Sequence, residues 1–217
     1  MNAPLPPAVV FDCDGTIADT ESLSDRAWTE MLVRYGYAPT AEDFRAVIGH
    51  PFAQNWAYFS GRADLGDQAA FRAMLRRRFI ELFETELHIY PDAVGTLRQL
   101  AADGVAIAVA SSSSHGHVLR VLERGGIADL VQAVVGADDV EDHKPHPAPY
   151  LRAAALVGVP AAACAAVEDT PVGVEAAKVA GMYTVAVVRR HHEPDEFGNA
   201  DRVVDTITPD VVRRCAG

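Results

Sequence analysis

Two aspartates separated by one residue follow an apolar run near the start of the chain. They are Asp12 and Asp14, in the segment VFDCDGT. Side chains alternate between the two sides of a strand, so these two carboxylates lie on the same side. A carboxylate can act as the nucleophile in phosphoryl transfer, and a second one beside it can protonate the leaving group and later activate water. The pair therefore indicates a reaction site at the end of a buried strand.

Polar side chains follow three other apolar runs in the same way. They are a run of serines that begins at Ser111, the lysine Lys144, and the acids Glu168 and Asp169. Ligands of open α/β sheets bind outside the carboxyl ends of the strands. We therefore expect these side chains to meet the two aspartates at one edge of a sheet.

Such a cluster of acids needs a cation, because its carboxylates repel one another and few basic residues accompany them. Oxygen ligands with few imidazoles favour Mg²⁺. Hydroxyls, a lysine and backbone amides at helix starts are groups that bind phosphate. The sequence thus predicts Mg²⁺ as the cofactor and a ligand that carries a phosphate group.

The elements that must position these residues form a repeating pattern of strands and helices. The strand-like runs are nearly all apolar, which is typical of strands covered by helices on both faces. Helical stretches over 91–104, 116–126, 147–159 and 171–182 alternate with them. This pattern predicts an α/β fold with a doubly wound, Rossmann-like parallel sheet. Its strands are expected at 8–11, 105–110, 131–135, 162–167 and 183–188.

Residues 20–88 do not fit this alternation, because they contain no buried-strand run. They contain helical stretches over 21–36, 40–49 and 67–87. We interpret this region as a helical insertion after the first strand. Its two ends, near residues 17–20 and 86–90, are then expected to lie close together.

Composition and charge limit the partners of the chain. The 217 residues carry a formal net charge of −11, which argues against broad binding to nucleic acid or to an anionic membrane. Three cysteines without a CxxC pair indicate neither a disulfide framework nor a zinc site. The start of the chain lacks the features of a signal peptide, and no apolar stretch is long enough to span a bilayer. We expect a soluble cytoplasmic protein that is a monomer or a weak homodimer.

Four segments in this order resemble the four motifs of the haloacid dehalogenase superfamily of phosphotransferases. They are DCDGT, ASSSS, HKPHPAPY and VEDTPVGVEAAKVAGM. The helical insertion resembles the small cap of the branch that contains phosphatases and beta-phosphoglucomutase. The resemblance implies an α/β core domain over 1–17 and 89–217, and a helical cap domain over 18–88.

The resemblance also implies roles for the acids and the lysine. Asp12 is the expected nucleophile and a metal ligand. Asp14 is the expected general acid and base, with its backbone carbonyl on the metal. Lys144 neutralises the charge of the nucleophile and the phosphate. Asp169 is expected to bind Mg²⁺ directly, and Glu168 directly or through water.

The phosphate ligands follow from the same resemblance. The Ser111 hydroxyl and the Ser112 amide are expected to bind phosphate. Thr16 is expected either to contact the transferring phosphoryl group or to orient Asp14.

The remaining candidates keep two interpretations each. His50 lies on a cap loop that often faces the active site in this family, so it is a candidate for substrate contact, with a structural role as the alternative. His115 can reach the site, whereas His117 is expected at the surface or within the helix. Asp19 is expected in the connection to the cap rather than in catalysis.

The expected function is a Mg²⁺-dependent phosphatase that hydrolyses a small phosphorylated metabolite, a sugar or polyol phosphate, through an aspartyl phosphate. A phosphomutase of the beta-phosphoglucomutase type is the alternative. The cap disfavours it, because Ser24 stands where the mutases carry a histidine, Ile48 replaces a lysine, and Phe52 stands near the position of an arginine. A non-catalytic relative is disfavoured because every catalytic position is intact, and a dehalogenase would leave the phosphate-binding set without a purpose.

Overall fold

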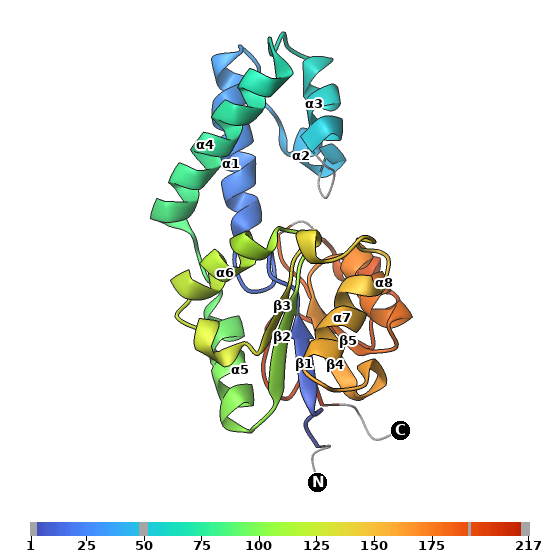
Figure 1. Cartoon of the computed structure of the whole chain (residues 1–217). Helices are drawn as coiled ribbons and strands as arrows, with labels where there is room; N and C mark the ends of the chain where they lie inside the picture. The colour runs from blue at the N-terminus through green and yellow to red at the C-terminus, as the bar shows by residue number, and fades with distance from the viewer. Residues whose placement is uncertain (1–3, 48–51, 191, 214–217) are drawn as a thin grey trace. The chain divides into compact units, whose positions relative to one another are not determined.

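A computed structural model describes residues 4–47, 52–190 and 192–213 of the chain. The chain divides into two units (Figure 1). Unit 1 consists of Met1–Asp19 and Ile89–Gly217, and unit 2 consists of Thr20–His88. Within the described residues, no helix is long and apolar enough to cross a membrane.

Unit 1 is built on a parallel sheet in the order β3-β2-β1-β4-β5-β6. This order confirms the predicted doubly wound sheet, and it reverses direction between β1 and β4, the position at which open α/β sheets bind their ligands. Phe11, the last residue of β1, is paired with Val109 and Val167 of the two flanking strands. The strands are β1 (Ala8–Phe11), β2 (Ala106–Ala110), β3 (Ala133–Val135), β4 (Cys164–Glu168), β5 (Tyr183–Val187) and β6 (Arg202–Val204).

The sheet contains one strand that the sequence pattern did not predict. The five expected strands are present within a few residues of their predicted bounds, and β6 is additional. This strand has three residues, lies at the edge of the sheet, and is largely exposed. It therefore lacks the apolar run by which the buried strands were recognised.

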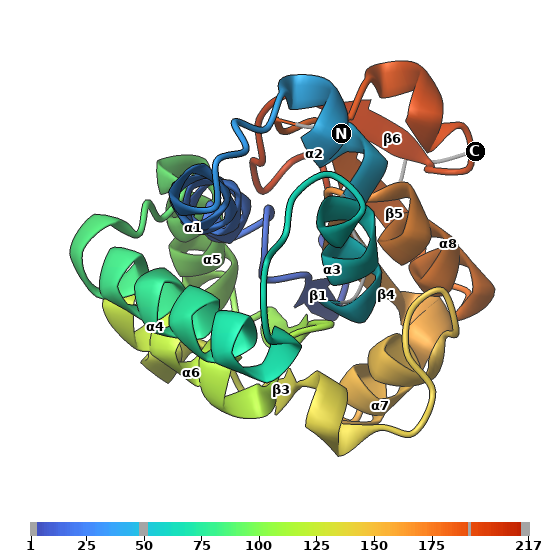
Figure 2. The ribbon, with the colours of Figure 1, turned by 90° about the horizontal axis from the view of Figure 1, so that it is seen from above.

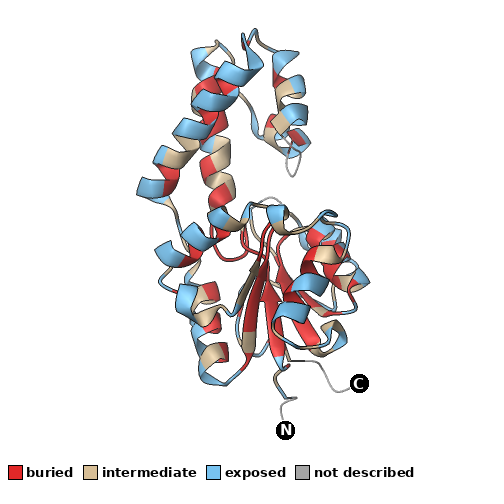
Figure 3. Ribbon diagram, viewed as in Figure 1, coloured by how far each residue is buried: buried red, intermediate tan, exposed pale blue. Residues whose placement is uncertain are grey.

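Helices cover both faces of the sheet, and its central strands β1 and β4 are buried (Figures 1 and 3). One face contacts α5 (Pro91–Ala102) and α6 (His115–Arg124), and the other contacts α7 (Ala148–Leu156) and α8 (Pro171–Val179). Burial on both sides explains why nearly every strand residue is apolar. The short 3₁₀ helices of unit 1 are η1 (Ala128–Leu130), η2 (Ala137–Asp139), η3 (Ala161–Ala163) and η4 (Pro194–Phe197).

Unit 2 is helical. Its helices α1 (Thr20–Arg34) and α4 (Gln68–Glu86) run side by side (Figures 1 and 2). The Trp28 ring packs against Phe59 and Phe71, at centroid distances of 5.2 and 5.5 Å. The predicted helical stretches correspond to α1, α2 (Ala41–Val47) and α4, while α3 (Phe52–Ser60) is additional.

The two chain segments that lead to and from unit 2 pair with each other inside unit 1. Ala18 forms an antiparallel bridge with Ile89, and the Tyr90 amide donates to the Ile17 carbonyl over 2.9 Å. This pairing confirms the predicted close approach of the two ends. Asp19 belongs to this connection, and its carboxylate lies 3.9 Å from the Arg190 guanidinium.

Candidate active site

The chain leaves β1 through a tight turn that carries the two aspartates. The Asp12 amide donates to the Val167 carbonyl over 2.9 Å, so the backbone still follows β4 at this point. Gly15 then adopts φ +86°, and a Cβ atom on it would lie 1.9 Å from Asp169 Oδ2. Glycine is needed here for two reasons, the left-handed conformation and the close approach of a carboxylate.

A buried lysine joins the ends of β1 and β4. Lys144 Nζ lies 2.6 Å from Asp12 Oδ1 and 2.6 Å from Glu168 Oε1. Its side chain is 4% exposed, and the ammonium stands 4.9 Å from the centroid of the Tyr150 ring. The sequence predicted that Lys144 meets the acids at the sheet edge, and the structure brings these three residues together.

Glu168 is fully buried and richly hydrogen-bonded. Its Oε1 accepts from Lys144 and from the Tyr150 hydroxyl, and its Oε2 accepts from the Asp169 amide and from the amide and hydroxyl of Thr170. Thr170 also caps α8, because its hydroxyl accepts from the Gly173 amide over 3.1 Å. Both carboxylate oxygens of Glu168 are therefore occupied, and the residue anchors Lys144.

Burial and charge set the ionisation of this cluster. Burial raises the pKa of Asp12 well above its usual value, nearby Glu168 and Asp14 raise it further, and Lys144 opposes the change. Burial disfavours the charge of Lys144, but Asp12 and Glu168 outweigh it and raise the pKa of the ammonium. Burial likewise opposes ionisation of Glu168, yet its contacts with Lys144 lower the pKa of that carboxyl. The positive charge of Lys144 is thus not enough to offset the burial of Asp12 and the repulsion from its neighbouring acids.

The acids fit a divalent cation. Oxygen atoms of Asp12, Glu168 and Asp169 lie within 4.8 Å of one another, and all three residues are buried. Lys144 alone cannot balance three buried carboxylates, and hard oxygen donors suit Mg²⁺. The Thr16 hydroxyl donates to Asp169 Oδ1 over 3.0 Å and fixes that side chain. Thr16 was expected to contact the phosphoryl group or to orient Asp14. In the structure its hydroxyl donates to Asp169, and the contact with a phosphoryl group stays a prediction.

Ser111 lies at the end of β2, beside the turn that carries Asp14. Its hydroxyl donates to Asp14 Oδ2 over 3.0 Å and accepts from the Ser113 amide over 2.9 Å. Ser111 is buried, whereas Ser112 is exposed. The hydroxyl predicted to bind phosphate is therefore in contact with the predicted acid and base.

His117 lies within α6, which is one of its two expected placements, and it makes a contact that was not expected. His117 was expected at the surface or within the helix, yet its Nε2 atom lies 2.9 Å from Asp14 Oδ1 and its side chain is 19% exposed. The sequence did not predict this contact, because it depends on α6 beginning beside the turn that carries Asp14, a juxtaposition that only the fold creates. His115 instead bonds to Asp139 through Nδ1, over 2.7 Å. His50 lies outside the described residues.

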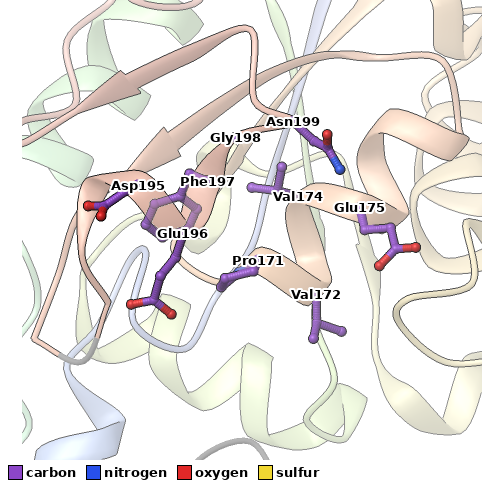
Figure 4. A pocket seen from close by; sticks show the side chains of 9 residues that line it. All are labelled: Pro171, Val172, Val174, Glu175, Asp195, Glu196, Phe197, Gly198 and Asn199. Atoms are coloured by element: carbon purple, nitrogen blue, oxygen red, sulfur yellow. The ribbon is translucent and has the colours of Figure 1, made fainter.

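Unit 1 also has a hollow of about 420 Å³ away from these residues (Figure 4). Acidic side chains border it, which disfavours a phosphate ester there. None of the residues predicted for the site lines it. The lining residues are Pro171, Val172, Val174, Glu175, Asp195, Glu196, Phe197, Gly198 and Asn199. The cluster at the ends of β1, β2 and β4 is therefore the candidate active site.

The doubly wound sheet brings carboxylates, a hydroxyl and a lysine together at its switch point. These are groups that phosphoryl transfer requires. Residues 9–187 match the family described as haloacid dehalogenase-like hydrolase, and the chain belongs to that family. Several similar proteins carry the names of phosphatases.

Three curated relatives share about a third of their aligned residues with this chain. Phosphoglycolate phosphatase of Rhodospirillum rubrum is 32% identical over 195 residues, which is 84% of this chain and 80% of that protein. Hexitol phosphatase A of Escherichia coli is 33% identical over 180 residues, 82% and 81% of the two chains. The Arabidopsis thaliana protein SUPPRESSOR OF QUENCHING 1, chloroplastic, is 32% identical over 188 residues, and this chain spans 18% of its length.

Solved structures of similar proteins have the same fold as this chain. A putative beta-phosphoglucomutase from Thermotoga maritima has a TM-score of 0.81 at 25% identity, and the match covers 94% of this chain and 95% of that one. CbbY from Rhodobacter sphaeroides, solved in complex with phosphate, has a TM-score of 0.77 at 27% identity, with 93% and 95% covered. The similarity thus extends over both units of the chain.

Proposed function

We propose that this chain is a Mg²⁺-dependent phosphatase that hydrolyses a small phosphorylated metabolite, a sugar or polyol phosphate, through an aspartyl phosphate on Asp12. The contact of Lys144 with both Asp12 and Glu168, at 2.6 Å each, carries the proposal. These two contacts place the buried carboxylate of Asp12 beside the ammonium of Lys144, at the switch point of the sheet. The name of one relative, hexitol phosphatase A, supports a polyol phosphate, and the name phosphoglycolate phosphatase supports a small phosphorylated metabolite.

The metal ligands follow from what the hydrogen bonds leave available. Asp12 and Asp169 would hold Mg²⁺ with their side chains, and Asp14 with its backbone carbonyl. Glu168 already accepts from donors at both oxygens, so it would take part through water or after releasing a donor. The bound ion supplies positive charge for the phosphate oxygens.

The proposed reaction has two steps. A carboxylate oxygen of Asp12 attacks phosphorus, the ester P–O bond breaks, and the leaving alkoxide takes a proton from Asp14 to become an alcohol. Water then attacks phosphorus and gives a proton to Asp14, and the P–O bond to Asp12 breaks. The products of the second step are inorganic phosphate and the free Asp12 carboxylate.

The other predicted groups stabilise the phosphate in both steps. Lys144 would balance the charge on Asp12 and on the transferring group, and Ser111 would donate its hydroxyl to a phosphate oxygen with the Ser112 amide beside it. We further propose that unit 2 acts as the cap and that His50 contacts the substrate there.

Replacement of the nucleophile tests this proposal. We expect Asp12→Asn to lower phosphate release from p-nitrophenyl phosphate with Mg²⁺ by about a thousandfold or more, because the amide is a poor nucleophile. The matched control is Asp129→Asn, which alters an exposed aspartate of the same unit and should keep wild-type activity. An Asp12→Asn variant that stays near the wild-type rate would exclude the mechanism.

A phosphomutase remains the second candidate, because the Thermotoga maritima neighbour carries that name. Ser24, Ile48 and Phe52 disfavour a mutase, because the mutases carry a histidine, a lysine and an arginine at or near these positions. Two rates decide the question with beta-glucose 1-phosphate as the substrate. Formation of glucose 6-phosphate much faster than release of phosphate would assign a mutase, and phosphate release alone would assign a phosphatase.

A further inference from the structure

His117 places an imidazole on the predicted general acid and base. Its Nε2 atom lies 2.9 Å from Asp14 Oδ1, while the Ser111 hydroxyl lies 3.0 Å from Asp14 Oδ2. The two partners come from different elements, because Ser111 follows β2 and His117 belongs to the first turn of α6. Each oxygen of the Asp14 carboxyl therefore has a hydrogen-bond partner.

A bound substrate would affect the Ser111–Asp14 contact and the His117–Asp14 contact differently. Under the proposed function, Ser111 is a phosphate ligand, so a bound phosphate competes with Asp14 for its hydroxyl. His117 is not among the phosphate-binding groups, so its contact with Oδ1 persists when Ser111 turns to the phosphate. General acid catalysis needs a carboxyl held within hydrogen-bond reach of the leaving oxygen. His117 is the partner that can hold it there.

We propose that His117 is a positioning residue that fixes the Asp14 carboxyl for proton transfer to the leaving oxygen. The proposal rests on the proposed function, since it assigns a partner to the acid of that reaction. The side chain of His117 is 19% exposed, so water competes weakly for the hydrogen bond. Its position on a helix anchored against the sheet gives the contact a fixed direction.

The leaving group distinguishes this role from a structural one. An alkoxide is strongly basic and needs a proton as the ester bond breaks, whereas p-nitrophenolate departs without one. Loss of a group that positions Asp14 should therefore affect alkyl phosphates selectively. A histidine that only supports the fold would change both substrates by the same factor. The ratio of kcat/KM for the two substrates reports this difference, because kcat/KM covers the steps up to departure of the leaving group.

The experiment compares His117→Ala, His117→Gln and His115→Ala. The substrates are p-nitrophenyl phosphate and the alkyl phosphate that the wild-type enzyme hydrolyses fastest in a metabolite panel, at saturating Mg²⁺. We expect His117→Ala to lower kcat/KM about tenfold to a hundredfold for the alkyl phosphate and less than about threefold for the aryl phosphate. His117→Gln should restore part of the loss, because its amide can donate to Asp14. His115→Ala is the matched control, and its ratio should equal that of the wild type.

Equal losses on both substrates, or an unchanged alkyl rate in His117→Ala, would overturn the inference. So would a His117→Gln variant that is no better than His117→Ala. Asp14→Asn separates this failure from failure of the proposed function. If Asp14→Asn loses the alkyl activity selectively while His117→Ala does not, only the role of His117 is wrong. If Asp12→Asn stays active, the proposed function itself is wrong.

Discussion

At the scale of single residues, the site depends on positions that carry no side chain. A Cβ atom on Gly15 would lie 1.9 Å from Asp169 Oδ2, and one on Gly173 would lie 1.7 Å from Glu168 Oε1. Such distances cannot be accommodated without moving the carboxylates. The glycines therefore determine where the two acids at the end of β4 can lie, although neither glycine takes part in the chemistry.

Gly173→Ala tests this steric requirement. Because the new methyl group would displace Glu168 and loosen its contact with Lys144, we expect lower phosphatase activity and a loss of about 1–3 kcal/mol in the free energy of unfolding. Gly95→Ala is the matched control. It lies in α5 with no atom within 4 Å of its added Cβ, so it should gain up to about 1 kcal/mol from helix propensity. Urea denaturation measures both, and a Gly173→Ala variant as stable and active as the wild type would contradict the assignment.

At the scale of elements, a buried aspartate ties α2 to α3. Asp43 Oδ2 accepts from the Tyr37 hydroxyl and from the amide and hydroxyl of Thr40, and Oδ1 accepts from the Tyr58 hydroxyl over 2.9 Å. Arg62 completes the set, with its Nε atom 3.4 Å from Oδ1. One carboxylate thus links the start of α2, the end of α3 and the loop before α2.

Asp43→Asn should destabilise the protein. We expect a loss of about 1–3 kcal/mol in the free energy of unfolding, because charge-assisted hydrogen bonds are weakened and one hydroxyl loses its acceptor. Glu42→Gln is the matched control, since it changes an exposed acid of the same helix and should have little effect. Chemical denaturation at neutral pH compares the variants, and equal stability of Asp43→Asn and Glu42→Gln would refute the role.

The same carboxylate makes a pH-dependent contribution to stability. The Thr40 amide and the Tyr37, Thr40 and Tyr58 hydroxyls lower the pKa of Asp43 from 3.8 to about 2, against the opposing effect of burial. Because the folded value lies below the unfolded one, the stabilisation is complete above about pH 4 and is lost as the pH falls through about 2. The stability difference between wild type and Asp43→Asn should shrink over that interval. A difference that stays constant would show that the charge of Asp43 is not responsible.

At the scale of the whole molecule, the proposed metal site would link ion binding to folding. The buried Asp12 lies far in the sequence from the adjacent acids Glu168 and Asp169, and only the folded chain brings the three together. An ion that binds this cluster binds the native state alone. It must therefore stabilise that state by mass action.

Thermal denaturation with and without Mg²⁺ measures this linkage without any assay of activity. At a Mg²⁺ concentration about one hundred times Kd, we expect a gain of about 2.7 kcal/mol, which EDTA should reverse. Asp169→Asn should reduce the gain, because it removes a ligand, while Asp103→Asn, at the exposed end of α5, should leave it unchanged. A Tm that does not respond to Mg²⁺ in the wild type would argue against the cation site.

Much of the unit 1 fold could be predicted because it depends on local patterns. Apolar runs separated by helical stretches determine a parallel sheet covered on both faces, since only such a sheet buries every residue of its strands. The two aspartates of DCDGT, with Lys144 and the acids at the end of β4, could be placed at one edge because parallel strands end on the same side. The strand β6 was not predicted, because its three largely exposed residues do not form a buried apolar run.

The tertiary structure decided which partners these residues have. Nothing in the local sequence shows that Glu168 anchors Lys144, that Thr16 binds Asp169, or that His117 reaches Asp14. Residue types and their order along the chain determine which groups arrive at the sheet edge. Hydrogen bonds between residues about 100 or more positions apart, such as His117 with Asp14, depend on strand order and helix placement, which a local pattern does not contain.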